Sequence, residues 1–330
     1  MRKLAGKLYS KGNDLRNSMY DRGTLKSYDL GARTISIGNL TTGGTGKTPL
    51  VAYVARLLAD NGEKVCVLTR GYGRRNENER VLVSDGNTVL VDADVGGDEP
   101  VELGQSLLGR AIVVAQADRV AAAKWAKEEF AVTTFILDDG FQHRRARRDL
   151  DIVCIDATDP FGNGMMLRES VSGLSRANAL IITRADLVDD VAQLSGQLRQ
   201  HNQHAPIFTT RTRIRSFLPI NSGGRNVSKP GKSFAFCALG NSEAFFDTLA
   251  RNEIVLTGKK AFRDHHRYIQ DDIDDLSKAA ESCGAEALLT TGKDAVKLHD
   301  LKFDLPCFIV EIETVVDDAD EFKQLVLTSS

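Results

Sequence analysis

The chain has 330 residues, of which 42% are apolar, and a formal net charge of −2 at pH 7. This composition is ordinary for a globular protein with about two domains, and the near-neutral charge gives no reason to expect nucleic acid as a partner. The five cysteines are scattered without a CxxC pair, which argues against a disulfide framework or a zinc site. No apolar run reaches the ~18 residues of a membrane span.

Residues 1–33 are locally basic, with eight Lys and Arg residues against three aspartates. Met1, Leu4 and Leu8, followed by Leu15 and Met19, fall near one helical face. A basic amphipathic helix can lie in the interface of an anionic membrane, and it can equally pack on the protein's own core. The sequence leaves both interpretations open.

A glycine-rich loop follows the β-rich run 34–37 and leads into 50–58, which has the apolar spacing of a buried helix. Strand, Gly-rich loop, Gly-Lys-Thr and helix together are typical of a phosphate-binding P-loop. Its backbone N–H groups and the helix N-terminus attract phosphate, Lys47 can reach the β- and γ-phosphates, and Thr48 can ligate Mg²⁺. Thr41 stands where the first glycine is usual. The predicted nucleotide-binding residues are Thr42, Gly43, Gly44, Thr45, Gly46, Lys47 and Thr48.

Two shorter motifs come next in the chain. The buried strand 64–69 ends in Arg70-Gly71-Tyr72-Gly73-Arg74, and ligands of α/β sheets bind at the carboxyl ends of strands. These side chains are therefore candidates for anion contacts, although a solvated glycine turn remains possible. Gly96-Gly97-Asp98-Glu99-Pro100 then opens a helix. From the residues alone, its two acids are ordinary N-terminal helix acids.

An apolar strand, 133–137, ends in Asp138-Asp139-Gly140-Phe141-Gln142-His143. A carboxylate at this position is typical of the Walker B element, which brings negative charge to Mg²⁺ beside the phosphates. We expect Asp138 or Asp139 to hold the metal together with Thr48. The arginines that follow, at 144, 145, 147 and 148, are either a solvated charge run or a clamp for a phosphorylated substrate.

The strand 179–183 ends in Thr183-Arg184-Ala185-Asp186, which is similar to the guanine-reading Asn/Thr-Lys-x-Asp of P-loop GTPases. Arg184 replaces the lysine that would stack on the base, so guanine specificity is doubtful. A P-loop GTPase or metal-insertion chaperone is nevertheless the first alternative function. A nucleotide sensor without catalysis is the second, and intact Lys47, Thr48, Asp138 and Asp139 argue against it.

Alternating strands and helices predict an α/β fold with parallel sheets in both halves. The tract 219–232 is the best linker candidate, because it is rich in Gly, Asn, Ser and Pro. We therefore predict a membrane-facing segment at 1–33, a P-loop domain at 34–220 and a smaller α/β domain at 225–330.

Taken together, these motifs resemble the tetraacyldisaccharide 4′-kinase family, the lipid A kinases. The resemblance runs along the whole chain in order. Gly292 stands where the family usually has Glu, and Ser242 where it usually has Pro. The resemblance is carried by the P-loop, Arg70-Gly71-Tyr72-Gly73-Arg74, Gly97-Asp98-Glu99-Pro100, Asp138-Asp139-Gly140-Phe141-Gln142-His143, Leu167-Arg168-Glu169, Phe262-Arg263-Asp264-His265, and Thr290-Thr291-Gly292-Lys293-Asp294-Ala295-Val296-Lys297.

The resemblance implies ATP-dependent, Mg²⁺-dependent phosphorylation of the 4′-hydroxyl of a tetraacylated disaccharide 1-phosphate, a step of lipid A biosynthesis. It implies that Asp98 accepts the proton of this hydroxyl and that His265, from the second domain, adjusts the proton affinity of Asp98. It also implies that Lys47 binds the phosphates. It further implies a peripheral protein on the cytoplasmic face of the inner membrane that needs no obligate protein partner. The substrate-binding candidates are Arg70, Tyr72, Arg74, Gln142, Arg168 and the arginines at 144–148.

Overall fold

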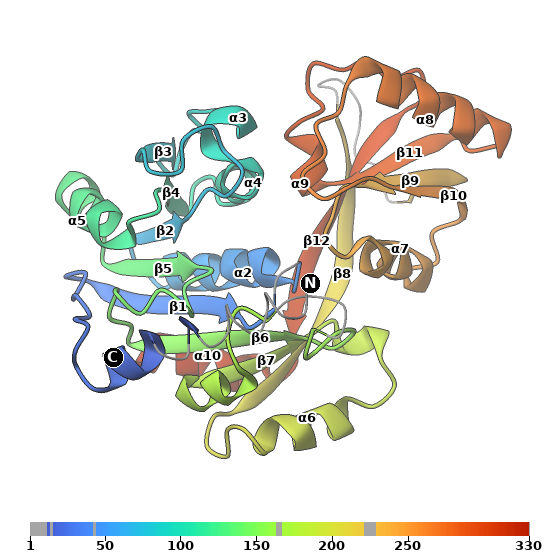
Figure 1. Cartoon of the computed structure of the whole chain (residues 1–330). Helices are drawn as coiled ribbons and strands as arrows, with labels where there is room; N and C mark the ends of the chain where they lie inside the picture. Colours follow the sequence, from blue (N-terminus) through green and yellow to red (C-terminus); the bar gives the residue numbers. More distant parts are fainter. Residues whose placement is uncertain (1–11, 14–15, 42–43, 163–166, 221–228, 330) are drawn as a thin grey trace.

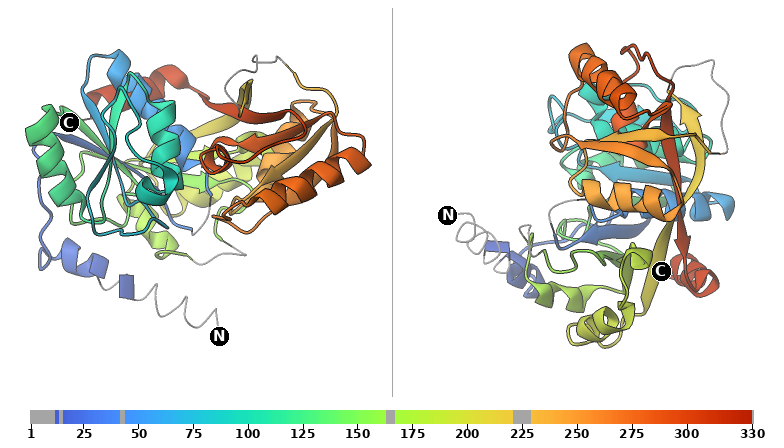
Figure 2. Two further views of the ribbon diagram at one scale, coloured as in Figure 1. Left: turned by 90° about the horizontal axis from the view of Figure 1, so that it is seen from above. Right: turned by 90° about the vertical axis from the view of Figure 1, so that its right-hand side faces the viewer.

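The computed structural model describes residues 12–13, 16–41, 44–162, 167–220 and 229–329. Within these residues, twelve strands form one hydrogen-bonded sheet in the order β10-β9-β11-β12-β8-β7-β6-β1-β5-β2-β4-β3 (Figure 1). The sheet bends into two lobes that lie side by side, with β8 and β12 running through both (Figure 2). The predicted α/β class is confirmed.

The first lobe is a mainly parallel sheet covered by helices. Among its described strands β1 to β7, only the edge strand β3 runs antiparallel to its neighbour. Its strands are β1 (Arg33–Asn39), β2 (Val65–Thr69), β3 (Val81–Ser84), β4 (Ala111–Ala115), β5 (Thr134–Asp138), β6 (Leu150–Asp156) and β7 (Ala179–Thr183). Its helices are α2 (Lys47–Asp60), α3 (Ala93–Gly96), α4 (Asp98–Ser106), α5 (Arg119–Phe130), α6 (Val191–Arg199) and the short 3-10 helices Val171–Arg176 and Ala185–Leu187.

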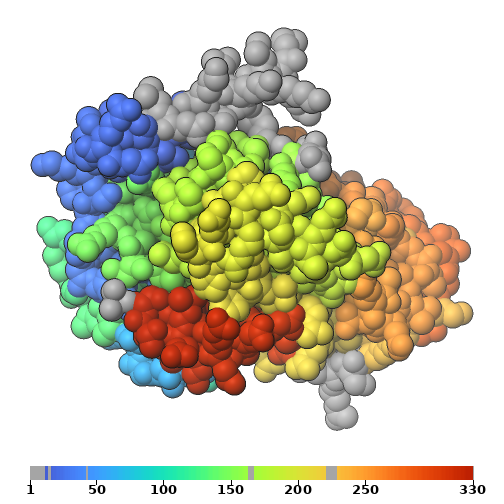
Figure 3. All heavy atoms as spheres, turned by 90° about the horizontal axis from the view of Figure 1, so that it is seen from below, coloured from blue at the N-terminus to red at the C-terminus, as the bar shows by residue number. Residues whose placement is uncertain are grey.

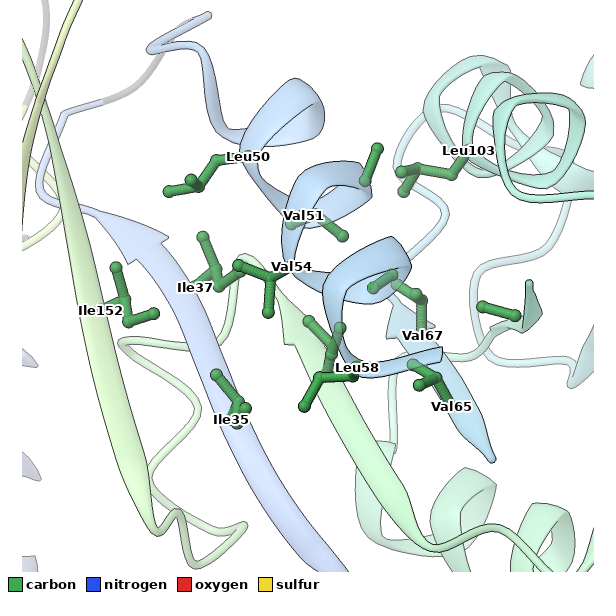
Figure 4. Close-up of a cluster of buried hydrophobic side chains, with 14 of the residues drawn as sticks. Ile35, Ile37, Leu50, Val51, Val54, Leu58, Val65, Val67, Leu103 and Ile152 are labelled. Atoms are coloured by element: carbon green, nitrogen blue, oxygen red, sulfur yellow. The ribbon is translucent and has the colours of Figure 1, made fainter. Parts of the chain in front are cut away.

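Helix α2 is held over the sheet by one apolar stripe. Leu50, Val54 and Leu58 recur at the four-residue spacing that keeps side chains on one helical face. They pack on Ile35 and Ile37 of β1 in a fully buried cluster (Figure 4). This packing fixes the start of α2, and with it the P-loop, at the carboxyl end of β1.

The second lobe is a smaller parallel sheet with helices on it, as predicted. Its strands are β9 (Ser233–Cys237), β10 (Leu256–Ala261) and β11 (Ala287–Thr291), and its helices are α7 (Ser242–Arg251), α8 (Gln270–Ser282) and α9 (Gly292–Ala295). All five cysteines of the chain are free, and only Cys283 is not fully buried.

Two long antiparallel strands join the lobes. The first is β8 (Ile207–Pro219), and it pairs with the second, β12 (Cys307–Val316). The chain therefore passes between the lobes twice within a paired ribbon. The linker predicted at 219–232 falls partly on 221–228, which lie outside the described residues.

The last helix, α10 (Ala319–Thr328), returns to the first lobe. Phe322 is fully buried there, with its ring centroid 5.2 Å from that of Phe208 and 6.1 Å from that of Tyr53. In the space-filling view, α10 (red) lies against first-lobe residues (Figure 3). The unit predicted at 225–330 thus contributes its last helix to the core of the first lobe. None of the described helices combines the length and apolar character needed to cross a membrane.

Candidate active site

The P-loop lies between β1 and α2. Gly46 adopts φ of 74°, a left-handed conformation that favours glycine, and Lys47 and Thr48 begin the helix. The Thr183 hydroxyl donates a hydrogen bond to the Thr45 carbonyl at 2.8 Å and ties the loop to β7. Of the predicted nucleotide-binding residues, Thr42 and Gly43 lie outside the described residues.

The loop after β5 packs directly against the base of the P-loop strand. A Cβ atom on Gly38 would lie 2.6 Å from Phe141 Cβ and 2.7 Å from its backbone nitrogen, so only glycine permits this approach. Strand β5 pairs with β1 in parallel, with Ile37 opposite Asp138. The two predicted aspartates are thereby delivered to the strand end beside the P-loop.

Asp139 is engaged by two cations. Lys47 Nζ lies 3.3 Å from Asp139 Oδ1, and Arg168 forms an ion pair with Oδ2. Burial opposes ionisation of Asp139, but Lys47 and Arg168 outweigh it and hold its pKa far below the ordinary value. Lys47, Arg168 and Asp139, three residues named from the sequence, therefore form one charged group.

Asp138 has the opposite environment. It is 4% exposed. Burial, together with the charges of Asp139 and Glu99, raises the pKa of Asp138 to about 7. A buried carboxylate of this kind is stabilised when a cation binds beside it.

The donor set at this point fits Mg²⁺. Asp138, Asp139 and the Thr48 hydroxyl supply hard oxygen atoms, which this ion prefers. No group of three or more His, Cys, Asp or Glu side chains among the described residues could hold a metal ion. A cation here would need further oxygen ligands, and nucleotide phosphates supply them.

A second polar cluster lies where α4 faces the second lobe. Asp98 is the first residue of α4, and its Oδ2 lies 3.2 Å from His265 Nδ1. His265 adopts φ of 60°, and its ring centroid is 5.8 Å from that of Tyr72. The neighbouring His266 pairs instead with Asp272 at 2.9 Å within its own lobe. The structure thus brings together two residues that are 167 positions apart in the sequence.

Two lysines of the second lobe complete this cluster and were not singled out as site residues from the sequence. Lys297 Nζ lies 3.1 Å from Asp98 Oδ2, and Lys293 Nζ lies 3.2 Å from Glu99 Oε1. Burial opposes ionisation of Asp98, but His265 and Lys297 outweigh it, so its pKa lies below the ordinary value. The signal was present in the sequence, since both lysines belong to the quoted motif 290–297, which begins at the carboxyl end of β11.

Arg74, which was predicted as a substrate contact, uses part of its guanidinium within the protein. Only 6% of the residue is exposed, and its guanidinium turns inward to donate to the carbonyls of Glu77 and Glu79. These hydrogen bonds stabilise the loop in which Arg74 itself lies, since Glu77 and Glu79 follow Arg74 by only three and five residues. Arg70 and Tyr72, in contrast, are exposed, and Arg70 pairs with Glu77 at 3.0 Å.

The other substrate candidates have partners within the protein. Gln142 donates to the Asn39 carbonyl at 2.8 Å and to Glu169 Oε1 at 3.1 Å. Three arginines of the run at 144–148 also form ion pairs: Arg144 with Asp21, Arg145 with Asp118, and Arg148 with Asp151. The structure therefore does not favour the clamp interpretation for these three.

The N-terminal segment reaches the same side of the molecule. Asn17 Nδ2 donates to Glu169 Oε2 at 2.7 Å, and Arg144 donates to the Asn17 carbonyl at 2.9 Å. These contacts place the described part of the segment beside Arg168. The apolar face predicted for residues 1–8 lies outside the described residues.

Comparison with known proteins identifies the family. The family model of tetraacyldisaccharide-1-P 4′-kinase matches residues 3–330. The chain is 35% identical to the tetraacyldisaccharide 4′-kinase of Desulfotalea psychrophila, covering 97% of this chain and 93% of that protein. It is 39% identical to that of Geobacter metallireducens, covering 88% and 86%.

The fold also matches a solved structure. The crystal structure of LpxK from Aquifex aeolicus in complex with ATP has a TM-score of 0.76 to this chain, with 29% identity, and covers 98% of this chain and 96% of that one. These matches do not favour the GTPase or metal-chaperone alternative. The chain belongs to the tetraacyldisaccharide-1-P 4′-kinase family and is a phosphotransferase.

Proposed function

We propose that the chain transfers the γ-phosphoryl group of ATP to the 4′-hydroxyl of a tetraacylated disaccharide 1-phosphate. The product is a bis-phosphorylated lipid A precursor. The observation that carries the proposal is the 3.2 Å contact between Asp98 and His265 across the two lobes, in a chain that matches these kinases over its whole length.

The nucleotide end of the site rests on the start of α2. Lys47 and the free N–H groups of the helix N-terminus bind the β- and γ-phosphates. Thr48, Asp138 and Asp139 hold Mg²⁺. When bound, this ion neutralises charge on the phosphates. Binding of ATP releases Lys47 from its pairing with Asp139, since both the phosphates and the carboxylate attract the same ammonium group.

The acceptor end of the site rests on Asp98. A sugar hydroxyl attacks phosphorus efficiently only when its proton has an acceptor, and a positioned carboxylate supplies one. The lowered pKa of Asp98 keeps it ionised at neutral pH, and His265 donates to it and limits its rotation. Arg70, Tyr72 and Arg168 are the proposed contacts of the substrate, with Gln142 holding the loop on which the metal-binding aspartates lie.

The substrate is an acylated lipid, so we place the enzyme on the cytoplasmic face of the inner membrane. The contact of Asn17 with Glu169 supports this placement, because it sets the basic N-terminal segment beside Arg168. The segment then brings an anionic membrane surface close to the site without crossing it.

The test is transfer of radiolabelled γ-phosphate from ATP to a synthetic tetraacyl disaccharide 1-phosphate, with the position of the new phosphate read by NMR. We expect one new phosphate at the 4′-oxygen. A preference for GTP, or a phosphate at another position, would contradict the proposal.

A chain that lacks residues 1–11 should keep its activity on detergent-dispersed substrate and lose activity on substrate in anionic vesicles. Equal activities would contradict the membrane part.

A further inference from the structure

The backbone between the two aspartates proposed to hold Mg²⁺ is in a strained conformation. Asp139 adopts φ of 58°, in the left-handed region that is unfavourable for a residue other than glycine. A half-turn of the peptide plane that joins Asp138 to Asp139 would give Asp139 a negative φ and relieve this strain. The same half-turn would swing the Asp138 carbonyl to the other side of the chain. A group that binds this carbonyl therefore holds the strained conformation.

The Asp138 carbonyl accepts a hydrogen bond from Arg119, the first residue of α5. Arg119 Nη2 donates to this carbonyl at 3.4 Å, while Nη1 donates to the carbonyls of Ala117 at 3.2 Å and Gln116 at 3.4 Å. Gln116 and Ala117 follow β4, and Asp138 ends β5. One planar guanidinium thus joins the carboxyl ends of two strands. Lysine could supply the charge but not this fixed fork of donors.

Arg119 is itself fixed in place. Only 4% of the residue is exposed, and Asp118 Oδ1 caps α5 by accepting from the N–H groups of Val120 and Ala121 at 3.1 Å and 3.2 Å. Its Nε atom is buried and has no hydrogen-bond partner among the described residues. A buried guanidinium with an unpaired donor is costly, so stability alone would favour an apolar side chain here. The guanidinium is nevertheless kept against the Asp138 carbonyl.

We propose that Arg119 is a positioning residue for the metal site, which binds the Asp138 carbonyl and so holds the strained peptide that orients the carboxylates of Asp138 and Asp139. Arg119 acts through the backbone and is not a metal ligand, since a guanidinium offers donors and no acceptor. This inference rests on the proposed function, in which the two carboxylates hold Mg²⁺. The property that Arg119 controls is therefore the affinity of the site for the ion.

The experiment titrates wild type and Arg119→Lys with Mn²⁺ in the presence of saturating ADP, with free Mn²⁺ measured by electron paramagnetic resonance. Lysine keeps the positive charge, so a difference reports on the geometry of the donors. Arg119→Lys should raise the dissociation constant of Mn²⁺ roughly tenfold to a hundredfold, because groups that orient metal ligands have effects of this size. The affinity for ADP without metal should stay nearly unchanged.

Arg33→Lys is the matched control. The Arg33 guanidinium also donates to two backbone carbonyls, those of Val326 and Ser329. Arg33 begins β1, whereas Asp138 lies at the carboxyl end of the parallel strand β5. Arg33→Lys should therefore leave the dissociation constant of Mn²⁺ unchanged, whatever its effect on stability.

A dissociation constant of Mn²⁺ in Arg119→Lys equal to that of wild type overturns the inference, and so does an equal loss of affinity in Arg33→Lys. If Arg119→Lys does not fold, Arg119→Gln takes its place. Removal of the positive charge by itself strengthens the binding of a cation, so weaker Mn²⁺ binding in Arg119→Gln still reports lost positioning, and equal or tighter binding overturns the inference.

Two other results would contradict the proposed function and not this inference. The first is a wild type that binds no Mn²⁺ in the presence of ADP. The second is a variant with both Asp138→Asn and Asp139→Asn that binds Mn²⁺ as tightly as wild type.

Discussion

Asp98 and Asp138 are both carboxylates at the edge of the sheet, but their surroundings give them opposite properties. Two side chains from the second lobe hold the pKa of Asp98 below its ordinary value. Burial and neighbouring acids raise the pKa of Asp138 to about 7. The proposed roles, proton acceptor for Asp98 and Mg²⁺ ligand for Asp138, rest on this difference. The groups that lower the pKa of Asp98, His265 and Lys297, are distant in sequence, and the burial of Asp138 depends on the fold, so residue type and spacing could not distinguish the two environments.

The arginines of the motif 70–74 also show how far the orientation of a side chain can be predicted from the sequence. The sequence indicated that the motif follows a strand, which was correct. It could not show that Arg74 turns inward and Arg70 outward, because that depends on which backbone carbonyls the loop presents.

Arg74→Gln should lower the free energy of unfolding by ~1–3 kcal/mol, because it removes the cationic donor of two part-buried hydrogen bonds to the carbonyls of Glu77 and Glu79. Chemical denaturation measures this. Arg75→Gln, on the exposed side of the same loop, should stay within about 0.5 kcal/mol. If Arg74→Gln kept full stability and instead raised KM for the lipid, the original prediction of a substrate contact would be restored.

Among the elements, α4 and α9 form the contact on which the site depends. Asp98 and Glu99 of α4 bind Lys297 and Lys293, and Glu102 follows one turn later against Gly292. A Cβ atom on Gly292 would lie 2.9 Å from Glu102 Oε1. Gly292 stands where the family usually has glutamate. The structure gives a reason, because Glu102 of the opposite helix lies where a side chain at position 292 would begin.

The carboxyl group of Glu102 makes this helix contact sensitive to pH. Burial raises its pKa to about 8, helped by Glu99, Asp294 and Asp98 and opposed by Lys293. The folded protein therefore keeps a proton that the unfolded chain has lost between the ordinary pKa of glutamate, near 4.5, and about 8. The contribution of Glu102 to stability consequently falls as pH rises through this window.

Glu102→Gln should therefore raise Tm at pH 8 relative to wild type and have little effect at pH 5, since glutamine resembles the protonated acid. Differential scanning calorimetry at the two pH values measures the difference. Glu128→Gln, on an exposed site of α5, gives the effect of an ordinary surface substitution. An equal change in Tm at both pH values would show that the ionisation of Glu102 is not involved.

The connections between elements were the part of the fold that the sequence predicted least well. Strands β1 and β5 were predicted because each contains a short run with the composition of a buried strand, and both are almost entirely buried in the structure. β8 alternates exposed arginines with less exposed residues, and its Arg213 forms an ion pair with Glu313 directly opposite on β12. The antiparallel pairing of β8 with β12 joins residues 89 to 106 positions apart, which local periodicity cannot reveal.

At the scale of the whole molecule, the proposed active site lies where the two lobes meet. The first lobe supplies the P-loop, the two aspartates proposed to bind Mg²⁺, and Asp98. The second supplies His265 and Lys297. The pairing of Asp98 with His265 entered as an implication of the family resemblance, because neither periodicity nor motif spacing places residues of two lobes together. The P-loop and Walker B aspartates are local motifs, and they were predicted from the residues themselves.

The central claim is that Asp98 and His265 act as one unit across the cleft, and a double-mutant cycle on kcat tests it most directly. Asp98→Asn should lower kcat by ~10²–10⁴ while ATP binding is kept, and His265→Ala should lower it as well. The account predicts that the double variant is about as slow as Asp98→Asn alone, since removing the base leaves nothing for the histidine to position. Independent effects that multiply in the double variant would contradict it.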